Sequence, residues 1–455
     1  MLRFPAGRRA FGMDSIEPTN RPLSIFLEDQ LSEGPPLDRA LSRADEMLDF
    51  SRGLYTGAMG LGLVEYFRSG LLAHQTLCRL LAWRFGSVAA TPSLLDFASG
   101  FGRTTRFLVR ELAPERIAIT EIKADAVEFQ RQRFGVQAYL TTTSPESLPE
   151  DRQFGAVFAA SFFTHLPERT FRPWLERLYR LVDDGCLFLF STMGKELLPA
   201  GTSLPPSGIH FERVSESAVL SLDDYGTAWV SEDFVRGALA EISGGKATVA
   251  HLPRGLWHFQ DLYVVVKGPA DLAGLPRERG PMGYVEACGL EDSGAVLRLI
   301  GWTADPSSPE VPRVEATLNG GPAGSAELGP RRTDTASVGL AEARSFEVRL
   351  RAERGLFEPD DVVLVKAIDR GGRELVLMAA AVETIVLYTK NDTALAGRMA
   401  RLEAELDGLR DASAKEIARL RARIAWMEAS RFWRLRETWT AWKRRLGLRV
   451  PEPPA

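Results

Sequence analysis

The sequence contains few cysteines and histidines, and it has no long apolar run. Its 455 residues include only three cysteines, Cys78, Cys186 and Cys288, and five histidines. Their spacing matches neither a disulfide framework nor a zinc motif, so we expect free thiols in a reducing compartment and no metal site. The apolar runs are too short for a membrane-spanning helix, and the amino-terminal residues lack the apolar stretch of a secretory signal. These absences predict a cytoplasmic protein.

The composition is that of a globular chain with several domains. Hydrophobic residues make up 45% and charged residues 25%, which excludes a largely disordered chain. The net charge of -4 is unevenly distributed, because residues 431–449 hold seven basic side chains and one acid, a local charge of +6. The rest of the chain is therefore acidic. This division predicts a basic appendage that seeks an anionic surface or a partner.

Changes of pattern along the chain predict six regions. Residues 1–75 are predicted to be helical and accessory, with a break near Gly53, Gly57, Gly60 and Gly62. The other predicted regions are an α/β domain (76–268), a Pro/Gly-rich linker (269–284), a β-sandwich (285–390), a coiled coil (391–428) and a basic, aromatic, amphipathic tail (429–455).

Residues 76–268 alternate short apolar runs with amphipathic helical segments. The apolar runs include SLLDFAS, RIAITEI, GAVFAAS and CLFLFST, and DLYVVVK at 261–267 reads as the closing strand. This alternation is typical of a parallel sheet with helices on both faces. The predicted fold class is therefore α/β, of the Rossmann-like type, with helical, β-sandwich and coiled-coil additions.

The stretch LLDFASGFGRTTRFL at 94–108 is the clearest candidate for a binding loop. An apolar strand ends near an acid, a small-residue turn follows, and a helix begins after it. Glycines let a ligand approach the backbone closely, and the free N–H groups of a helix start attract anionic or polar groups. The dinucleotide pattern G-x-G-x-x-G needs a third glycine where Thr105 stands, so NAD is disfavoured.

This turn resembles motif I of class I S-adenosylmethionine (SAM)-dependent methyltransferases, D-x-G-x-G-x-G. Asp96, Ser99, Gly100 and Gly102 fall on that pattern, and Ala98 replaces its first glycine. The resemblance covers roughly residues 90–268 and implies a Rossmann-like methyltransferase domain with SAM as cofactor. It places Asp96 near the methionine amino group and the turn backbone against the methionine portion. A turn cap without a binding role is the alternative for Asp96.

The same resemblance extends to three later segments. Glu121 ends the next strand, where family members keep an acid for the ribose hydroxyls, and a solvated charge is the alternative. Residues 161–165 follow the fourth strand, which places Ser161 and His165 over the cofactor. Thr142, Thr143 and Ser144 occupy the place where many relatives hold an acid near the adenine.

His165 is the candidate general base, because a hydroxyl acceptor must lose its proton and imidazole titrates in the useful range. A histidine that packs the loop or positions the acceptor is the competing interpretation. His210 and His258 are alternative bases, and an insertion with Asp223, Asp224 and Tyr225 is expected to form part of the acceptor wall.

The added regions suggest the acceptor. The catalytic region has no basic, aromatic-interleaved patch, so nucleic acid is excluded as a partner. The sandwich, the coil and the SRFWRLR tail resemble multidomain bacterial proteins that modify surface polysaccharides. We therefore expect O-methylation of a sugar in a glycan or lipid-linked precursor, homo-oligomers through the coil, and tail contact with the inner face of the membrane. A small-metabolite methyltransferase, an inactive scaffold and a tail bound to a partner helix are the alternatives.

Overall fold

The computed structural model describes residues 15–31, 34–55, 59–148, 152–199, 201–215, 220–334, 340, 342–386 and 419. The chain divides into two compact units, Met1–Thr389 and Lys390–Ala455, and the description below concerns the first. The predicted coiled coil and basic tail lie outside the described residues, apart from residue 419. Among the described residues, no helix combines the length and the apolarity that crossing a bilayer requires.

The helices and strands of residues 15–266 are as follows. The helices are α1 (Arg21–Gln30), α2 (Glu46–Gly53), α3 (Met59–Phe85), α4 (Thr105–Leu108), α5 (Ala124–Phe134), α6 (Glu168–Arg180) and α7 (Glu232–Ser243). The strands are β1 (Ser15–Ile16), β2 (Leu41–Ser42), β3 (Leu94–Phe97), β4 (Ile117–Glu121), β5 (Gln137–Leu140), β6 (Phe154–Ala159), β7 (Val182–Gly194), β8 (Ile209–Glu212), β9 (Thr227–Val230), β10 (Thr248–Leu256) and β11 (Gln260–Val266). Short 3-10 helices include η4 (Phe163–His165).

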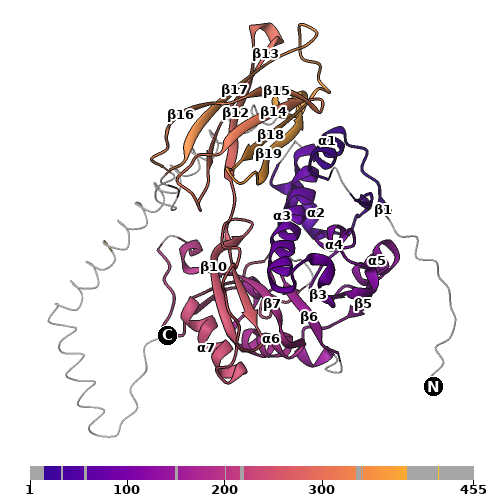
Figure 1. The fold of residues 1–455 in the computed structure, drawn as a ribbon, viewed down its shortest axis with the longest axis vertical. Coiled ribbons are helices and arrows are strands. Elements are labelled where there is room, and N and C mark those ends of the chain that lie inside the picture. Colours follow the sequence, from indigo (N-terminus) through magenta and orange to yellow (C-terminus); the bar gives the residue numbers. More distant parts are fainter. Residues whose placement is uncertain are drawn as a thin grey trace. The chain divides into compact units, whose positions relative to one another are not determined.

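Nine of these strands form one sheet, with the main order β10-β11-β7-β6-β3-β4-β5 (Figure 1). Strands β5, β4, β3, β6 and β7 are parallel, whereas β11 runs antiparallel to both β7 and β10. The chain builds outward from β3 to β5, returns to β6 and then continues on the other side. The switch point therefore lies between β3 and β6, where open α/β sheets bind ligands beyond the carboxyl ends of their strands.

Helices cover both faces of this sheet, as the alternation of apolar runs and helices predicts. On one face α3 and α5 share a core with alternate strand residues such as Ile119 and Phe158. On the other face α6 and α7 pack against the strand residues that alternate with these, such as Ala118 and Val157. Because both faces are buried, the central strands are apolar at nearly every position. This is a Rossmann-like, doubly wound sheet, as the sequence predicts.

Helix α3 begins after the predicted break, since α2 ends at Gly53 and α3 starts at Met59. It runs without interruption through residue 75, where the sequence places a domain boundary, and Gly60 and Gly62 lie inside it. A Cβ at Gly62 would stand 2.6 Å from the Cα of Arg52 in α2. This glycine therefore permits close helix contact and does not mark a break.

Eight further strands form two four-stranded sheets, in agreement with the expectation of a β-sandwich. One sheet has the order β12-β13-β17-β16 and the other β15-β14-β18-β19. Their bounds are β12 (Met282–Glu291), β13 (Val296–Ala304), β14 (Arg313–Leu318), β15 (Gly321–Ser325), β16 (Glu327–Arg331), β17 (Arg344–Arg351), β18 (Val362–Ile368) and β19 (Glu374–Ala381). The sheets share a core that includes Leu299, Val348 and Val365.

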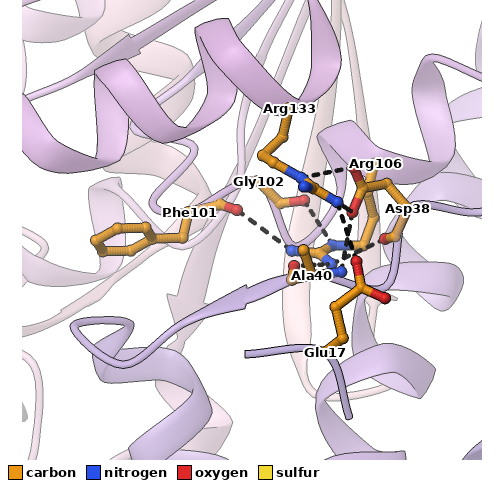
Figure 2. A network of polar contacts seen from close by, with 7 residues as sticks. All are labelled: Glu17, Asp38, Ala40, Phe101, Gly102, Arg106 and Arg133. Atoms are coloured by element: carbon orange, nitrogen blue, oxygen red, sulfur yellow. Dashed lines mark hydrogen bonds and ion pairs between the residues drawn. The ribbon is translucent and has the colours of Figure 1, made fainter. Parts of the chain in front are cut away.

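A buried arginine joins the turn after β3 to the amino-terminal segment (Figure 2). The Arg106 side chain is fully buried and donates hydrogen bonds to the carbonyls of Gly102 (3.1 Å), Phe101 (3.4 Å), Asp38 (3.1 Å) and Ala40 (3.0 Å). Arg133 of α5 closes the same network through an ion pair with Asp38. The buried guanidinium of Arg106 thus supports the turn through hydrogen bonds to backbone carbonyls.

Replacing Arg106 tests how much the fold depends on this network. We expect Arg106→Met to lower the free energy of unfolding by about 3 kcal/mol or more, because several buried carbonyls lose their donor. Arg133→Met is the matched control, since it removes a partly exposed ion pair that is worth up to about 1 kcal/mol. Urea unfolding of both variants measures the difference, and equal losses would contradict this account.

Candidate active site

The turn between β3 and α4 has an unusual backbone. Ala98, Gly100 and Gly102 have φ values of 54°, 58° and 77°, in the left-handed region that favours glycine. Hydrogen bonds fix this shape, since the Ser99 N–H donates to the Thr120 carbonyl (3.2 Å) and the Gly102 N–H donates to that of Ser99 (3.0 Å). Alanine therefore occupies, at Ala98, a conformation that the motif usually gives to glycine.

The two glycines serve different needs. A Cβ at Gly102 would stand 2.4 Å from a ring carbon of Phe134 and 2.9 Å from Oε1 of Gln130, so Gly102 allows the turn to pack against α5. A Cβ at Gly100 would meet nothing within 4 Å. Because Gly100 also lines a cavity of about 980 Å³, its bare backbone leaves room for a ligand there.

Asp96 lies at the end of β3 and is 3% exposed. Its Oδ2 accepts a hydrogen bond from the Thr105 hydroxyl (2.7 Å). Burial raises the pKa of Asp96 to about 7, although the bond from Thr105 and the charge of Arg103 oppose the shift. The carboxyl group is therefore close to half-protonated at neutral pH, and a cationic ligand group beside it would favour its charged form.

Glu121 joins the ends of β3 and β4. One of its oxygens accepts from the Gly100 N–H (2.9 Å), and the other accepts from the N–H groups of Ile122 (2.7 Å) and Lys123 (3.3 Å). Burial raises the pKa of Glu121 even though these bonds favour its charged form. A carboxylate has about four acceptor positions, so the three bonds leave capacity for a ligand hydroxyl.

Ser161 and His165 follow β6. The Ser161 N–H donates to the Ser191 hydroxyl (2.7 Å), and the Ser161 hydroxyl accepts from Gln260 (2.9 Å). The His165 Nδ1 lies 2.8 Å from the Gly226 carbonyl oxygen, and the ring stacks on Tyr225 with centroids 4.4 Å apart. Because a carbonyl can only accept, Nδ1 carries the proton and Nε2 is the basic nitrogen.

One cavity of about 980 Å³ collects most of these residues. Asp96, Ala98, Ser99, Gly100, Glu121, Ser161 and His165 line it, as do Thr142, Thr143 and Ser144. Gly102 does not, because it faces α5. The volume is at the upper end of the roughly 300–1,000 Å³ of ordinary ligand pockets, which leaves space for a cofactor and an acceptor together.

The other predicted acceptor residues divide between the cavity and the surface around it. Asp224, Tyr225 and His258 line the cavity, whereas Asp223 and His210 do not. His210 instead pairs with Glu212 (3.1 Å). Burial, aided by nearby arginines, lowers the pKa of His258 to about 4, so this ring is neutral at physiological pH.

Sequence reasoning missed an entire wall of this cavity. The end of α2 and the residue after it contribute Phe50 and Leu54, and α3 contributes Glu65, Arg68 and Ser69. The turn between β10 and β11 contributes Trp257 and Phe259. It also missed Arg103 and Gln130, whose amide donates to Ser99 (2.7 Å) and to the Gly100 carbonyl (2.8 Å). No local sequence pattern marks Gln130, because its partners Ser99 and Gly100 lie about thirty residues earlier in the chain.

One comparison with known protein families agrees with this geometry. Residues 94–185 match a family model described as a methyltransferase domain. The search of curated proteins gave no match.

Among solved structures, the complex of DhpI with SAH is 16% identical over 50% of this chain and 97% of that one, with a TM-score of 0.33. DesVI of Streptomyces venezuelae is 17% identical over 50% and 99%, with a TM-score of 0.35. A SAM-dependent methyltransferase of Clostridium acetobutylicum is 11% identical over 44% and 92%, with a TM-score of 0.33. Likeness at this level says nothing about the acceptor of this chain.

The matched segment contains the turn after β3, the end of β4 and the loop after β6, which are the parts of the sheet that border the cavity at its switch point. The residues also suit the cofactor, since an open glycine backbone, a carboxylate with spare acceptor positions and a buried acid face one space. The chain therefore contains a class I methyltransferase domain and is an enzyme that uses S-adenosylmethionine as its methyl donor.

Proposed function

We propose that the enzyme methylates a hydroxyl oxygen of a sugar, in a cell-surface glycan or its lipid-linked precursor. The observation that carries the proposal is the tautomer of His165. With Nδ1 held by the Gly226 carbonyl, Nε2 has the lone pair that removes a hydroxyl proton. The cavity wall supplies this base, and SAM when bound supplies the methyl group.

The wall formed by α2, α3 and the β10–β11 turn supports a sugar acceptor. The aromatic side chains of Phe50 and Phe259 are 47% and 46% exposed and line the cavity. Glu65 lines it as well and is held by Arg68 at 2.6 Å. Aromatic rings pack against the C–H face of a sugar, and carboxylate oxygens accept from its hydroxyls, so this combination suits a polyol.

The predicted coil and tail extend the proposal beyond the cavity. We propose that residues 391–428 associate copies of the chain and that residues 429–455 bring the enzyme to an anionic membrane surface, where a lipid-linked acceptor would lie. Tryptophans favour the bilayer interface, and each nearby basic residue adds about 1 kcal/mol of attraction to anionic lipid.

Methyl transfer from tritiated SAM into fractionated cell material tests the proposal. We expect label in the glycan or lipid-linked fraction. His165→Ala should lower the rate by roughly 10²- to 10⁴-fold while SAM still binds, because only the proton acceptor is lost. His210→Ala is the matched control and should transfer normally. Label only in small molecules would favour a metabolite methyltransferase, and SAM binding without label in any fraction would favour a scaffold.

The pH dependence of SAM binding tests the placement of Asp96. The pKa of Asp96 in the folded chain is about 7, above the usual value of 3.8. The protonated carboxyl group therefore contributes to the stability of the fold, and this contribution is lost as the pH rises towards 7. Binding of the donor's amino group needs the charged form. We therefore expect SAM affinity to fall by about tenfold per pH unit below 7. Calorimetric titrations between pH 5.5 and 7 should show this slope, and Asp96→Asn should remove it. A flat wild-type profile would contradict the assignment.

A further inference from the structure

Arg103 is a half-buried cation with few partners. It follows Gly102 in the turn and lines the cavity. Its only hydrogen bond within the described part of the chain runs from Nη1 to the Ser69 hydroxyl (3.1 Å), and its guanidinium lies 5.1 Å from the centre of the Trp257 ring. Arg106, three residues later, donates to four carbonyls. A guanidinium has five N–H donors, so most of those of Arg103 have no partner among the described residues.

The acids around Arg103 are engaged elsewhere. Asp45 accepts from the Tyr66 hydroxyl (2.5 Å), Glu65 pairs with Arg68 and Asp96 accepts from Thr105. None of them forms an ion pair with Arg103 in the described structure. Burial lowers the pKa of Arg103, while Tyr66 and these acids oppose the shift. A half-buried charge without a close counter-ion has lost part of its hydration, and an anionic ligand would relieve this cost.

Two neighbouring segments fix the position of Arg103. The Trp257 indole N–H donates to the carbonyl of Ser69 (2.7 Å), so the ring under the guanidinium is tied to the helix that holds the hydroxyl. A Cβ at Gly70 would stand 2.3 Å from the Arg103 carbonyl oxygen, which shows how closely α3 meets the turn. The side chain is thus preorganised before a ligand binds.

We propose that Arg103 binds the α-carboxylate of SAM through charge-assisted hydrogen bonds. The turn that carries it is the segment expected to hold the methionine portion, and the carboxylate is the anionic group of that portion. Planar carboxylates suit the guanidinium fork. The inference rests on the use of SAM and not on the identity of the acceptor.

Two ligands that differ in the amino-acid portion test this assignment. S-adenosylhomocysteine has the carboxylate, and 5′-methylthioadenosine lacks the whole amino-acid portion. By calorimetry we expect Arg103→Met to weaken S-adenosylhomocysteine binding roughly a hundredfold and to leave methylthioadenosine binding within about twofold. Arg103→Lys should recover part of the loss, because it keeps the charge without the fork. Arg110→Met, outside the cavity, is the control.

Equal losses for both ligands would show a structural role and overturn the proposal, as would unchanged binding of S-adenosylhomocysteine. Thermal unfolding of each variant shows whether it is folded. If Arg103→Met does not fold, the same comparison with Arg103→Lys decides, since a smaller but ligand-selective loss is still expected. Wild-type binding of S-adenosylhomocysteine is measured alongside, so failure of this inference is distinct from failure of the cofactor assignment.

A different observation concerns the sandwich. Strand β18 is buried on both faces: Val363 and Val365 face the other sheet, whereas Val362 and Leu364 join a core with Phe26 of α1 and Phe67 of α3. Polar contacts reinforce this second interface. Lys366 pairs with Asp29 (3.1 Å), and Arg68 donates to the Val376 carbonyl (3.3 Å).

Helix α3 therefore contacts the sandwich and the cofactor turn at once. Arg68 binds a carbonyl of β19, and the next two residues, Ser69 and Gly70, meet Arg103. We infer that the sandwich is a structural part of the cofactor site and unfolds together with it. It is not an independently folded module on a flexible linker.

Hydrogen exchange of the full chain tests this coupling. Ligand binding should slow global opening roughly a hundredfold when free S-adenosylhomocysteine is about a hundred times its Kd. We expect peptides of β17, in the sheet that does not include β18 and β19, to gain as much protection as peptides of β6. Val348→Ala in β17 should speed exchange in both. Protection gained in β6 alone, or acceleration in β17 alone, would overturn the inference.

Discussion

The site depends on one backbone constraint, the left-handed conformation of the turn between β3 and α4. Such a turn is unfavourable for Ala98 and is maintained only because its surroundings fix it. Arg106 donates a hydrogen bond to the carbonyl of Gly102 in the turn, and Glu121 accepts one from the Gly100 N–H. Glu121 also lines the cavity, whereas Arg106 lies buried behind the turn, so the space for the cofactor depends on contacts on both sides of the turn.

Helix α3 extends this constraint to the rest of the first unit. One side of the helix packs on the sheet through Ala73 and Leu77, and another packs on the sandwich through Phe67. Between these contacts, Ser69 and Gly70 meet the turn at Arg103. These contacts on two sides make α3 a rigid wall of the cavity, and they join the α/β sheet and the sandwich into one folded unit. The Pro/Gly-rich segment before the sandwich is also fixed, since Trp83 donates to the carbonyl of Ala273 (3.0 Å) and Leu275 is buried.

The sequence was informative where function and local pattern coincide. The strand ending at Asp96, the glycine turn and the acid at Glu121 are local signals, and they predicted the methyltransferase domain and its cofactor correctly. Arg103 and Arg106 gave no such signal, because an arginine in an amphipathic segment reads as a solvated charge. Their partners at 38, 40 and 69 come together only in the folded chain. The VVLV run of β18 does carry a signal, since a strand that is apolar at successive positions is buried on both faces. The assignment of each predicted residue to a part of the cofactor stays a prediction.

The central claim is that SAM lies against the open backbone of the turn at Gly100. Calorimetric titration of the purified chain with SAM, beside Gly100→Val, tests it most directly. The account predicts one SAM per chain for the wild type and no binding for the variant, because a branched side chain strains the left-handed turn at residue 100 and fills the open space beside its backbone. Absence of binding to the wild type, or undiminished binding to Gly100→Val, would contradict the account.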